Sequence, residues 1–181
     1  MSVTVETHFF NGNGRVPNSR LPVLVYRDIW KSPEMENRMR ANNWYPSWHS
    51  PIGMYPQHHF HSQAHELIAV ESGEITALLG GHDGREATLR AGDVVVLPAG
   101  TGHFGVSITD DLFVTGAFPA GFGVLDFRLG FPEEYDELRE VSRRVPIPAR
   151  DPFFGVGGPL PSLWADADIG RSVPKTVAAG V

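Results

Sequence analysis

Three histidines and one glutamate, set within two glycine-framed stretches, constrain this chain more than any other feature. The four residues are His59, His61, Glu66 and His103. The first stretch covers residues 53–73 and the second covers residues 92–103. Imidazole nitrogens and one carboxylate oxygen together form a mixed ligand set that suits a divalent transition metal. If the four side chains meet in space, the protein can hold a metal ion that keeps open coordination positions.

Size and composition limit the remaining choices. The 181 residues suit one domain with extensions, and 41% hydrophobic residues are enough for a real core. The formal net charge is −6 without any block of like charges, so we expect neither nucleic acid nor a membrane as a partner. The absence of cysteine excludes disulfides and thiolate ligands. No signal-like start and no apolar run of roughly 20 residues are visible, so a cytoplasmic protein is expected.

The middle of the chain has the pattern of an antiparallel sheet protein. Twenty glycines and 15 prolines are spread through the sequence, as in folds that join many short strands by tight turns. From Gly53 to Phe118 almost every segment is expected to be a strand. The expected strands are residues 55–61, 66–71, 74–79, 85–90, 94–97, 102–108 and 112–118. Strands of this length and spacing predict an all-β sandwich or barrel.

The N-terminal part, residues 1–50, is expected to pack on that barrel. We predict strands at residues 3–10 and 21–26. A helix should begin after Ser32, because a hydroxyl N-cap, a proline and then acidic residues form a good helix start. This helix should end near Ala41, and residues 44–49 follow as an aromatic connector.

Three further segments complete the predicted organisation. Residues 51–125 form the barrel core, and residues 126–164 form a C-terminal helix with an arm rich in proline and glycine. That helix is expected at 132–144, because its acidic residues come first and its basic residues last. We expect residues 165–181 to be a mobile tail, since the local sequence offers little to hold them.

Strand geometry explains how the four side chains could meet. Side chains alternate between the two faces of a strand, so His59 and His61 point the same way. A short hairpin turn can bring Glu66 back beside them, and His103 can arrive from a distant strand. Three imidazoles and one carboxylate leave about two of six positions free on an octahedral ion.

The two stretches resemble the paired motifs of the cupin superfamily. Residues 53–73 fit G-x5-H-x-H-x4-E-x6-G, and residues 92–103 fit G-x5-P-x-G-x2-H. The asparagine that usually closes the second motif is replaced by Ser107, which concerns packing more than metal binding. The resemblance implies a cupin-type antiparallel β-barrel (a double-stranded β-helix or jelly roll) with a few peripheral helices. It also implies that His59, His61, Glu66 and His103 bind Fe, Mn, Ni, Cu or Zn.

A narrower resemblance covers residues 5–164. It rests on the segments Phe-Asn-Gly-Asn-Gly-Arg-Val-Pro-Asn at 10–18, His-His-Phe-His-Ser-Gln-Ala-His-Glu at 58–66, and Val-Pro-Ile-Pro-Ala-Arg-Asp-Pro-Phe-Phe-Gly at 145–155. These segments are similar to the YjlB-like group of single-domain cupins. The resemblance supports the fold and the metal site but does not indicate a substrate.

Other residues have a plain interpretation beside a functional one. Tyr55 and Gln57 share strand parity with His59 and are the predicted substrate or catalytic contacts, unless Pro56 breaks the register. Ile68 and Val70 share parity with Glu66 and should form an apolar wall. His58 is expected on the surface or in packing, His65 in stabilising a turn, and His49 mainly outside the pocket. Trp44 and Trp48 should pack in the core or cover the barrel mouth. The four-residue set itself could be a structural cluster without metal.

Three functions remain open at this point. The first is a metal-dependent enzyme that acts on a small organic molecule, with an Fe(II) dioxygenase-type oxidoreductase favoured. The second is a non-redox isomerase, lyase or cyclase with Zn, Mn or Ni as a Lewis acid. The third is a small-molecule-binding module without catalysis. Exposed strand edges need cover, so we expect a homodimer.

Overall fold

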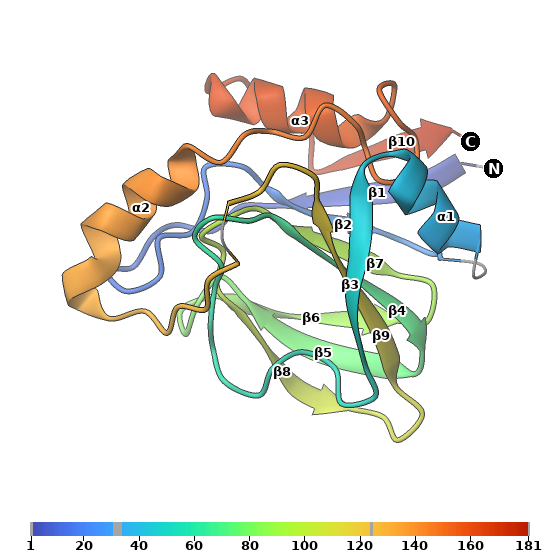
Figure 1. Cartoon of the computed structure of the whole chain (residues 1–181), viewed down its shortest axis with the longest axis horizontal. Coiled ribbons are helices and arrows are strands. Elements are labelled where there is room, and N and C mark those ends of the chain that lie inside the picture. Colours follow the sequence, from blue (N-terminus) through green and yellow to red (C-terminus); the bar gives the residue numbers. More distant parts are fainter. Residues whose placement is uncertain (1, 31–33, 124, 181) are drawn as a thin grey trace.

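The computed structural model describes residues 2–30, 34–123 and 125–180. In this part of the chain, all strand pairing is antiparallel and the strands form two sheets, with helices at the periphery (Figure 1). This architecture confirms the predicted all-β, cupin-type jelly roll.

Within the described ranges, the larger sheet has seven strands and the smaller sheet has three. The order of the larger sheet is β10 (Thr176–Gly180), β1 (Ser2–His8), β2 (Val23–Tyr26), β7 (Val94–Leu97), β4 (Glu66–Ser72), β9 (Phe113–Pro119) and β3 (Trp44–Ser50). The order of the smaller sheet is β6 (Arg85–Arg90), β5 (Glu74–Leu79) and β8 (His103–Ile108).

The larger sheet is buried on both faces. Along β4, Leu67 and Ala69 belong to one hydrophobic cluster, while Ile68 and Val70 belong to another. The second cluster lies between the two sheets, because it also contains Ile75 of β5. Two-sided burial explains why β2 and β7 are continuous apolar runs instead of alternating patterns. Glu66 shares the parity of Ile68, so its carboxylate lies on the inner side.

Helices cover the outer face of the larger sheet. Figure 1 shows α3 (Pro159–Asp168) crossing the molecule beside β10 and β1. The outer cluster contains Trp44 of β3 and Trp164 of α3, both fully buried. Met39 of α1 (Glu34–Ala41) joins the same cluster. The outer core is therefore built from segments at both ends of the chain.

Two glycines are required by close packing around the strands. Gly73 joins β4 to β5 with φ +70°, and a Cβ there would lie 2.7 Å from the Cα of Leu112. Gly116 in β9 lies under the ring of Trp48, where a Cβ would come within 1.9 Å of the indole. A larger residue at Gly116 would therefore displace Trp48 from the cavity wall.

Several predicted elements match the structure, and some differ. Helix α1 ends at Ala41 as predicted, but its predicted N-cap Ser32 lies outside the described residues. Residues 44–49 lie in strand β3 and are not a connector, and residues 55–61 form only isolated bridges at positions 59 and 60. The helix predicted at 132–144 is a short 3-10 turn η1 (Pro132–Glu134) followed by α2 (Tyr135–Arg143).

The C-terminal segment corrects the expectation of a mobile tail. Residues 176–180 form β10, which pairs with β1 in the register Ser2↔Gly180 to Glu6↔Thr176. The segment is held by a strand from the opposite end of the chain, a contact that no local pattern reveals. Strand β2 in turn covers the edge of β7 within the same subunit. No helix in the described ranges is long and apolar enough to cross a membrane.

Candidate metal centre

The two sequence motifs meet through their backbones. His59 and His103 form an antiparallel bridge, with His59 N–H donating to the His103 carbonyl (3.2 Å) and His103 N–H donating to the His59 carbonyl (2.9 Å). Gly100 N–H also donates to the His61 carbonyl at 2.8 Å. These bonds fix the first motif against the loop of the second, so the side chains of both motifs converge.

The convergence brings three imidazoles together. One ring nitrogen from each of His59, His61 and His103 lies within 4.8 Å of the others, and such a group could hold a metal ion. Glu66, the first residue of β4, approaches two of these rings. Its Oε2 lies 3.3 Å from His61 Nε2 and 3.2 Å from His103 Nε2. His59, Glu66 and His103 are buried, and the His61 side chain is only 10% exposed.

Backbone carbonyls orient all three imidazole rings. Each Nδ1 lies at hydrogen-bonding distance from a carbonyl oxygen, which makes Nδ1–H the donor and leaves Nε2 as a lone pair. The acceptors are Gln57 O for His59 (2.9 Å), Asp126 O for His61, and Thr101 O for His103 (3.0 Å). Imidazoles held in this tautomer present Nε2 as a metal ligand.

The carboxylate of Glu66 is only half satisfied by the protein. Its Oε1 accepts a hydrogen bond from the indole Nε1–H of Trp48 at 3.1 Å. Its Oε2 is buried without a hydrogen-bond partner among the described residues, although it faces the Nε2 atoms of His61 and His103. Lone pairs on both sides would repel one another, and a buried unsatisfied oxygen is costly. A cation bound between these atoms removes both problems.

Burial and charge shift the pKa values of these groups. Burial lowers the pKa of His59 to about 3, with His103 adding to the effect. Burial opposes ionisation of Glu66, but the nearby imidazoles of His103 and His61 outweigh it and lower the pKa of the carboxyl. Burial likewise lowers the pKa of His61, but Glu66 more than compensates, so the net shift is upward. The site therefore contains an ionised carboxylate beside imidazoles, which is the state that binds a metal.

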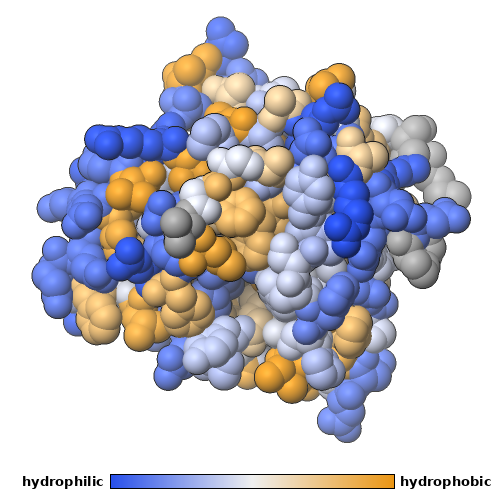
Figure 2. Space-filling model, in the orientation of Figure 1, coloured by the Kyte–Doolittle hydropathy of each residue, from blue (hydrophilic) through white to orange (hydrophobic). Residues whose placement is uncertain are grey.

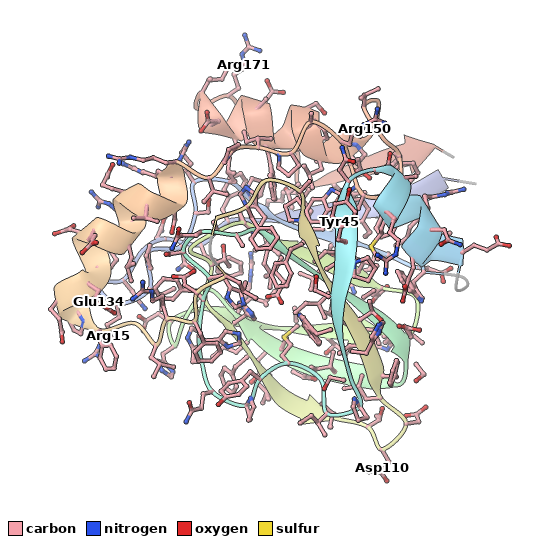
Figure 3. All side chains as sticks on the ribbon, viewed as in Figure 1. Arg15, Tyr45, Asp110, Glu134, Arg150 and Arg171 are labelled. Carbon is pink, nitrogen blue, oxygen red and sulfur yellow. The ribbon has the colours of Figure 1, made fainter. Side chains whose placement is uncertain are left out.

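Residues 125–128 close one side of the site and hold His61. The Asp126 carboxylate accepts hydrogen bonds from Ser62 N–H (2.8 Å), Ser62 Oγ–H (2.6 Å) and Gln63 N–H (3.2 Å). Arg128 donates to Asp126 at 2.8 Å and to Glu134 at 3.1 Å. Figure 3 shows Glu134 at the end of the helical segment that leads into α2. The carbonyl that orients His61 is thus anchored from two directions.

A cavity of about 480 Å³ opens over the three imidazoles. Its apolar walls include Ile52, Met54, Ile68, Phe118, Leu125 and Phe127. Phe127 stacks on the His59 ring, with centroids 4.3 Å apart and planes 15° apart. Figure 2 shows apolar residues gathered near the middle of the face turned to the viewer. Val70, predicted as a wall residue, lies in the core between the sheets and not among the cavity residues.

The two predicted substrate contacts have different positions. Tyr55 lines the cavity, and its ring packs edge-on against Phe127 (4.8 Å) and His59 (5.8 Å). Gln57 does not line the cavity. Its side chain is exposed, and its contribution is the carbonyl that accepts from His59. The parity argument fails for Gln57 because residues 55–58 are irregular, the effect anticipated for Pro56.

The other histidines lie outside the cavity. His58 packs against the rings of His82 and Phe104, in agreement with a packing role. His49 contacts Thr115 Oγ1 at 2.7 Å, away from the cavity residues.

His65 does more than stabilise a turn. Its Nδ1 accepts from Ala99 N–H at 2.9 Å, and its Nε2–H donates to the Pro146 carbonyl at 3.1 Å. Its ring also packs on Trp164, with centroids 4.6 Å apart. One imidazole therefore joins the second motif to the C-terminal arm and to α3.

Sequence reasoning missed the roles of Trp48 and Asp126 in positioning the site. Trp48 was considered only for packing or for the barrel mouth, yet it donates to Glu66. Trp44 and Trp48 are four residues apart, so regular alternation would put them on the same face. A register shift between Pro46 and Trp48 instead turns Trp48 to the inner side, and no local pattern marks it. Asp126 lies in an irregular segment, 64 residues from its partner Ser62, so no local signal marks it.

Comparison with known proteins shows the family of this chain. Residues 48–114 match the cupin domain family Cupin_2. The chain is 34% identical to the uncharacterized protein YjlB of Bacillus subtilis (strain 168) over 166 residues, which cover 91% of this chain and 99% of YjlB.

Solved structures with a similar arrangement are more distant. RmlC from Streptococcus suis, in complex with dTDP-D-xylose, is 12% identical with a TM-score of 0.37, and the match covers 65% of this chain and 74% of RmlC. Oxalate decarboxylase from Bacillus subtilis is 20% identical with a TM-score of 0.35, covering 58% of this chain and 27% of that chain.

Proposed function

This chain belongs to the YjlB-like cupins, and from that premise we propose that it is a metal-dependent enzyme acting on a small organic molecule, most simply an Fe(II) dioxygenase-type oxidoreductase. The observation that carries the proposal is the convergence of three oriented imidazoles, two of them beside a buried carboxylate, beneath an apolar cavity. Buried polar atoms in a purely structural cluster are normally hydrogen-bonded, whereas Glu66 Oε2 has no hydrogen-bond partner among the residues that the structure describes.

The residues present fit a divalent transition metal. His59, His61, His103 and Glu66 would hold the ion, which makes a mixed nitrogen and oxygen set suited to Fe(II), and also to Mn, Ni, Zn or Cu. When bound, Fe(II) would supply redox chemistry with dioxygen and open positions for an organic chelator. The carbonyls of Gln57, Asp126 and Thr101 keep each imidazole in the ligating tautomer. Trp48 holds the carboxylate in place.

The cavity walls support redox chemistry more than proton transfer. Among the described lining residues, the titratable groups are the four proposed ligands and the Tyr55 hydroxyl. Isomerases and lyases need a positioned acid or base in addition to a Lewis acid. A dioxygenase instead needs a dry pocket that protects reactive species, and apolar side chains exclude water.

Tyr55 supports a second candidate function. Its ring lies at the cavity beside His59, so its hydroxyl is the described group best placed to move a proton. In that case the ion would act as a Lewis acid in an isomerase, lyase or cyclase. A Tyr55→Phe variant separates the candidates, because it should stop proton transfer but only perturb an oxidative reaction.

Oxygen consumption provides the direct test. Protein purified without oxygen and loaded with iron should consume dioxygen in the presence of phenolic, diketone or hydroxy-acid chelators, and His103→Ala should not. Turnover without oxygen in zinc-loaded protein would support the Lewis-acid candidate instead. Recovery of an intact small molecule from purified protein, with no turnover under either condition, would leave a binding module.

A further inference from the structure

The charge on the cavity wall restricts what can bind in it. No lysine or arginine lines the cavity among the residues that the structure describes. Arg128 belongs to the segment that forms one wall, but its guanidinium is paired with Asp126 and Glu134. An anionic ligand would therefore find no compensating cation in the described wall, and the bound metal would be its only positive partner.

Charge balance at the proposed centre points to a singly charged ligand. A divalent ion held by three neutral imidazoles and one carboxylate keeps a single positive charge. A ligand with one negative charge makes the assembly neutral. A ligand with two negative charges leaves one uncompensated charge against an apolar wall, which is costly where the effective dielectric constant is low.

The mouth of the cavity is apolar on both sides. Ile52 is 67% exposed, and Leu125 and Phe127 are 47% and 44% exposed. Phe127 and Tyr55 pack edge-on, so an aromatic pair borders the opening. Exposed apolar residues at the rim of a pocket favour an apolar group on the ligand that covers them.

We propose that the substrate is a singly charged bidentate chelator with an apolar or aromatic body, such as the enolate of a diketone or a phenolate with a neighbouring oxygen donor. This inference rests on the proposed metal-dependent function. Small dicarboxylates of the same bite should bind poorly, because the described wall offers nothing to balance their second charge.

A matched pair of chelators tests the charge rule. Acetylacetonate and malonate form chelate rings of the same size but carry one and two negative charges. Zinc-loaded protein, which is redox-silent, is titrated with each by calorimetry, and each affinity is divided by that of the same ligand for zinc in water. The ratio should favour acetylacetonate at least about tenfold, and benzoylacetonate should bind about tenfold more tightly still, as its phenyl group buries apolar surface. An equal or reversed ratio overturns the proposal.

A rim variant reverses the expected preference. Ile52→Lys places a cation at the exposed mouth, and Ile52→Gln is the matched neutral control. The lysine should raise malonate affinity about fivefold relative to acetylacetonate, and the glutamine should not change the ratio. An unchanged ratio in both variants would contradict the charge argument.

The two proposals fail in different ways. Protein that takes up no zinc by elemental analysis overturns both the metal centre and the substrate class. Selective chelator binding with no oxygen consumption after iron loading leaves the substrate class intact and removes the dioxygenase. Oxygen consumption with dicarboxylates alone would support the dioxygenase and overturn the proposed substrate class.

Discussion

Two buried carboxylates, Asp151 in the outer region and Glu66 in the inner cavity, are treated differently by this fold. Both oxygens of Asp151 are satisfied: Oδ2 accepts from Tyr26 O–H (2.6 Å) and Leu160 N–H (3.1 Å), and Oδ1 accepts from Phe153 N–H (2.9 Å) and Phe154 N–H (3.0 Å). One oxygen of Glu66 accepts from Trp48, and the other has no hydrogen-bond partner in the described structure.

This is the difference expected between an acid that stabilises the fold and one that we propose binds a metal. Asp151 joins β2, the arm at 151–155 and the start of α3, and around it the outer core is filled by Trp44 and Trp164. Glu66 lines an open cavity, and its Oε2 faces the imidazoles of His61 and His103. Where the protein supplies every donor, the carboxylate stabilises the fold. Where the described residues supply a donor to only one oxygen, as in Glu66, the other oxygen is available to bind an ion.

The largest expected effect separates the two acids by stability. Asp151→Ala leaves the Tyr26 hydroxyl and backbone N–H groups unsatisfied, so we expect a loss of roughly 4 kcal/mol in the free energy of unfolding. Glu66→Gln in metal-free protein should change it by less than about 1 kcal/mol. Urea denaturation monitored by circular dichroism measures both. Equal losses would show that Glu66 is a structural acid as well.

Acid should weaken the outer region through His65. Burial lowers the pKa of this imidazole from 6.5 to about 4. Between pH 6.5 and about pH 4, this imidazole is protonated in the unfolded chain but neutral in the folded protein. The free energy of unfolding therefore decreases as the pH is lowered through this range, and it levels off below about pH 4. The loss is roughly 3 kcal/mol, and none of it is present above pH 6.5. In His65→Gln, the slope of the unfolding free energy against pH between about pH 4 and 6.5 should correspond to one fewer proton taken up on unfolding. An unchanged slope would contradict the assignment.

Removing a proposed ligand should affect the metal and not the fold. His59→Ala, His61→Ala and His103→Ala should each lower metal affinity by about a hundredfold or more, because each removes one of four donors. Circular dichroism spectra should stay close to wild type. His82→Ala is the matched control, since its exposed side chain does not line the cavity. Unfolding of all three variants would mean that the cluster holds the fold together.

The smallest expected effect concerns the orienting residues. Trp48→Phe keeps an aromatic ring but removes the hydrogen bond to Glu66, so metal affinity should fall about tenfold. The free energy of unfolding should change much less than in Asp151→Ala. Zinc competition with a chromophoric chelator provides the measurement. A wild-type affinity would show that the indole only packs.

The sequence predicted the strands of the barrel well, because burial leaves a strong local pattern there. Strands β4, β5, β6 and β7 begin at their predicted residues, since apolar runs and glycine turns define them. The four proposed ligands come from their residue types and from the resemblance of the two motifs to cupins, and they stay a prediction. Their spatial convergence follows from strand parity and one long-range pairing.

Contacts between segments that are far apart in the sequence could not be predicted from local sequence patterns. The pairing of β10 with β1 joins the two ends of the chain, and β3 was hidden by the proline at position 46 and by its aromatic composition. The strand predicted at 55–61 failed because this segment is held by single bridges from His59 to His103 and from Phe60 to Arg128. The partners of Glu66 and His61, Trp48 and Asp126, became visible only with the tertiary structure.

One consequence follows from the segment at 125–128, which both walls the cavity and holds His61. Leu125 and Phe127 border the entrance, and the carbonyl of the intervening Asp126 receives the Nδ1–H of His61. A displacement of this segment that widened the entrance would also draw that carbonyl away from the imidazole. Entry of a bulky molecule and the orientation of His61 are therefore coupled, because widening the entrance would weaken the hydrogen bond that holds this imidazole.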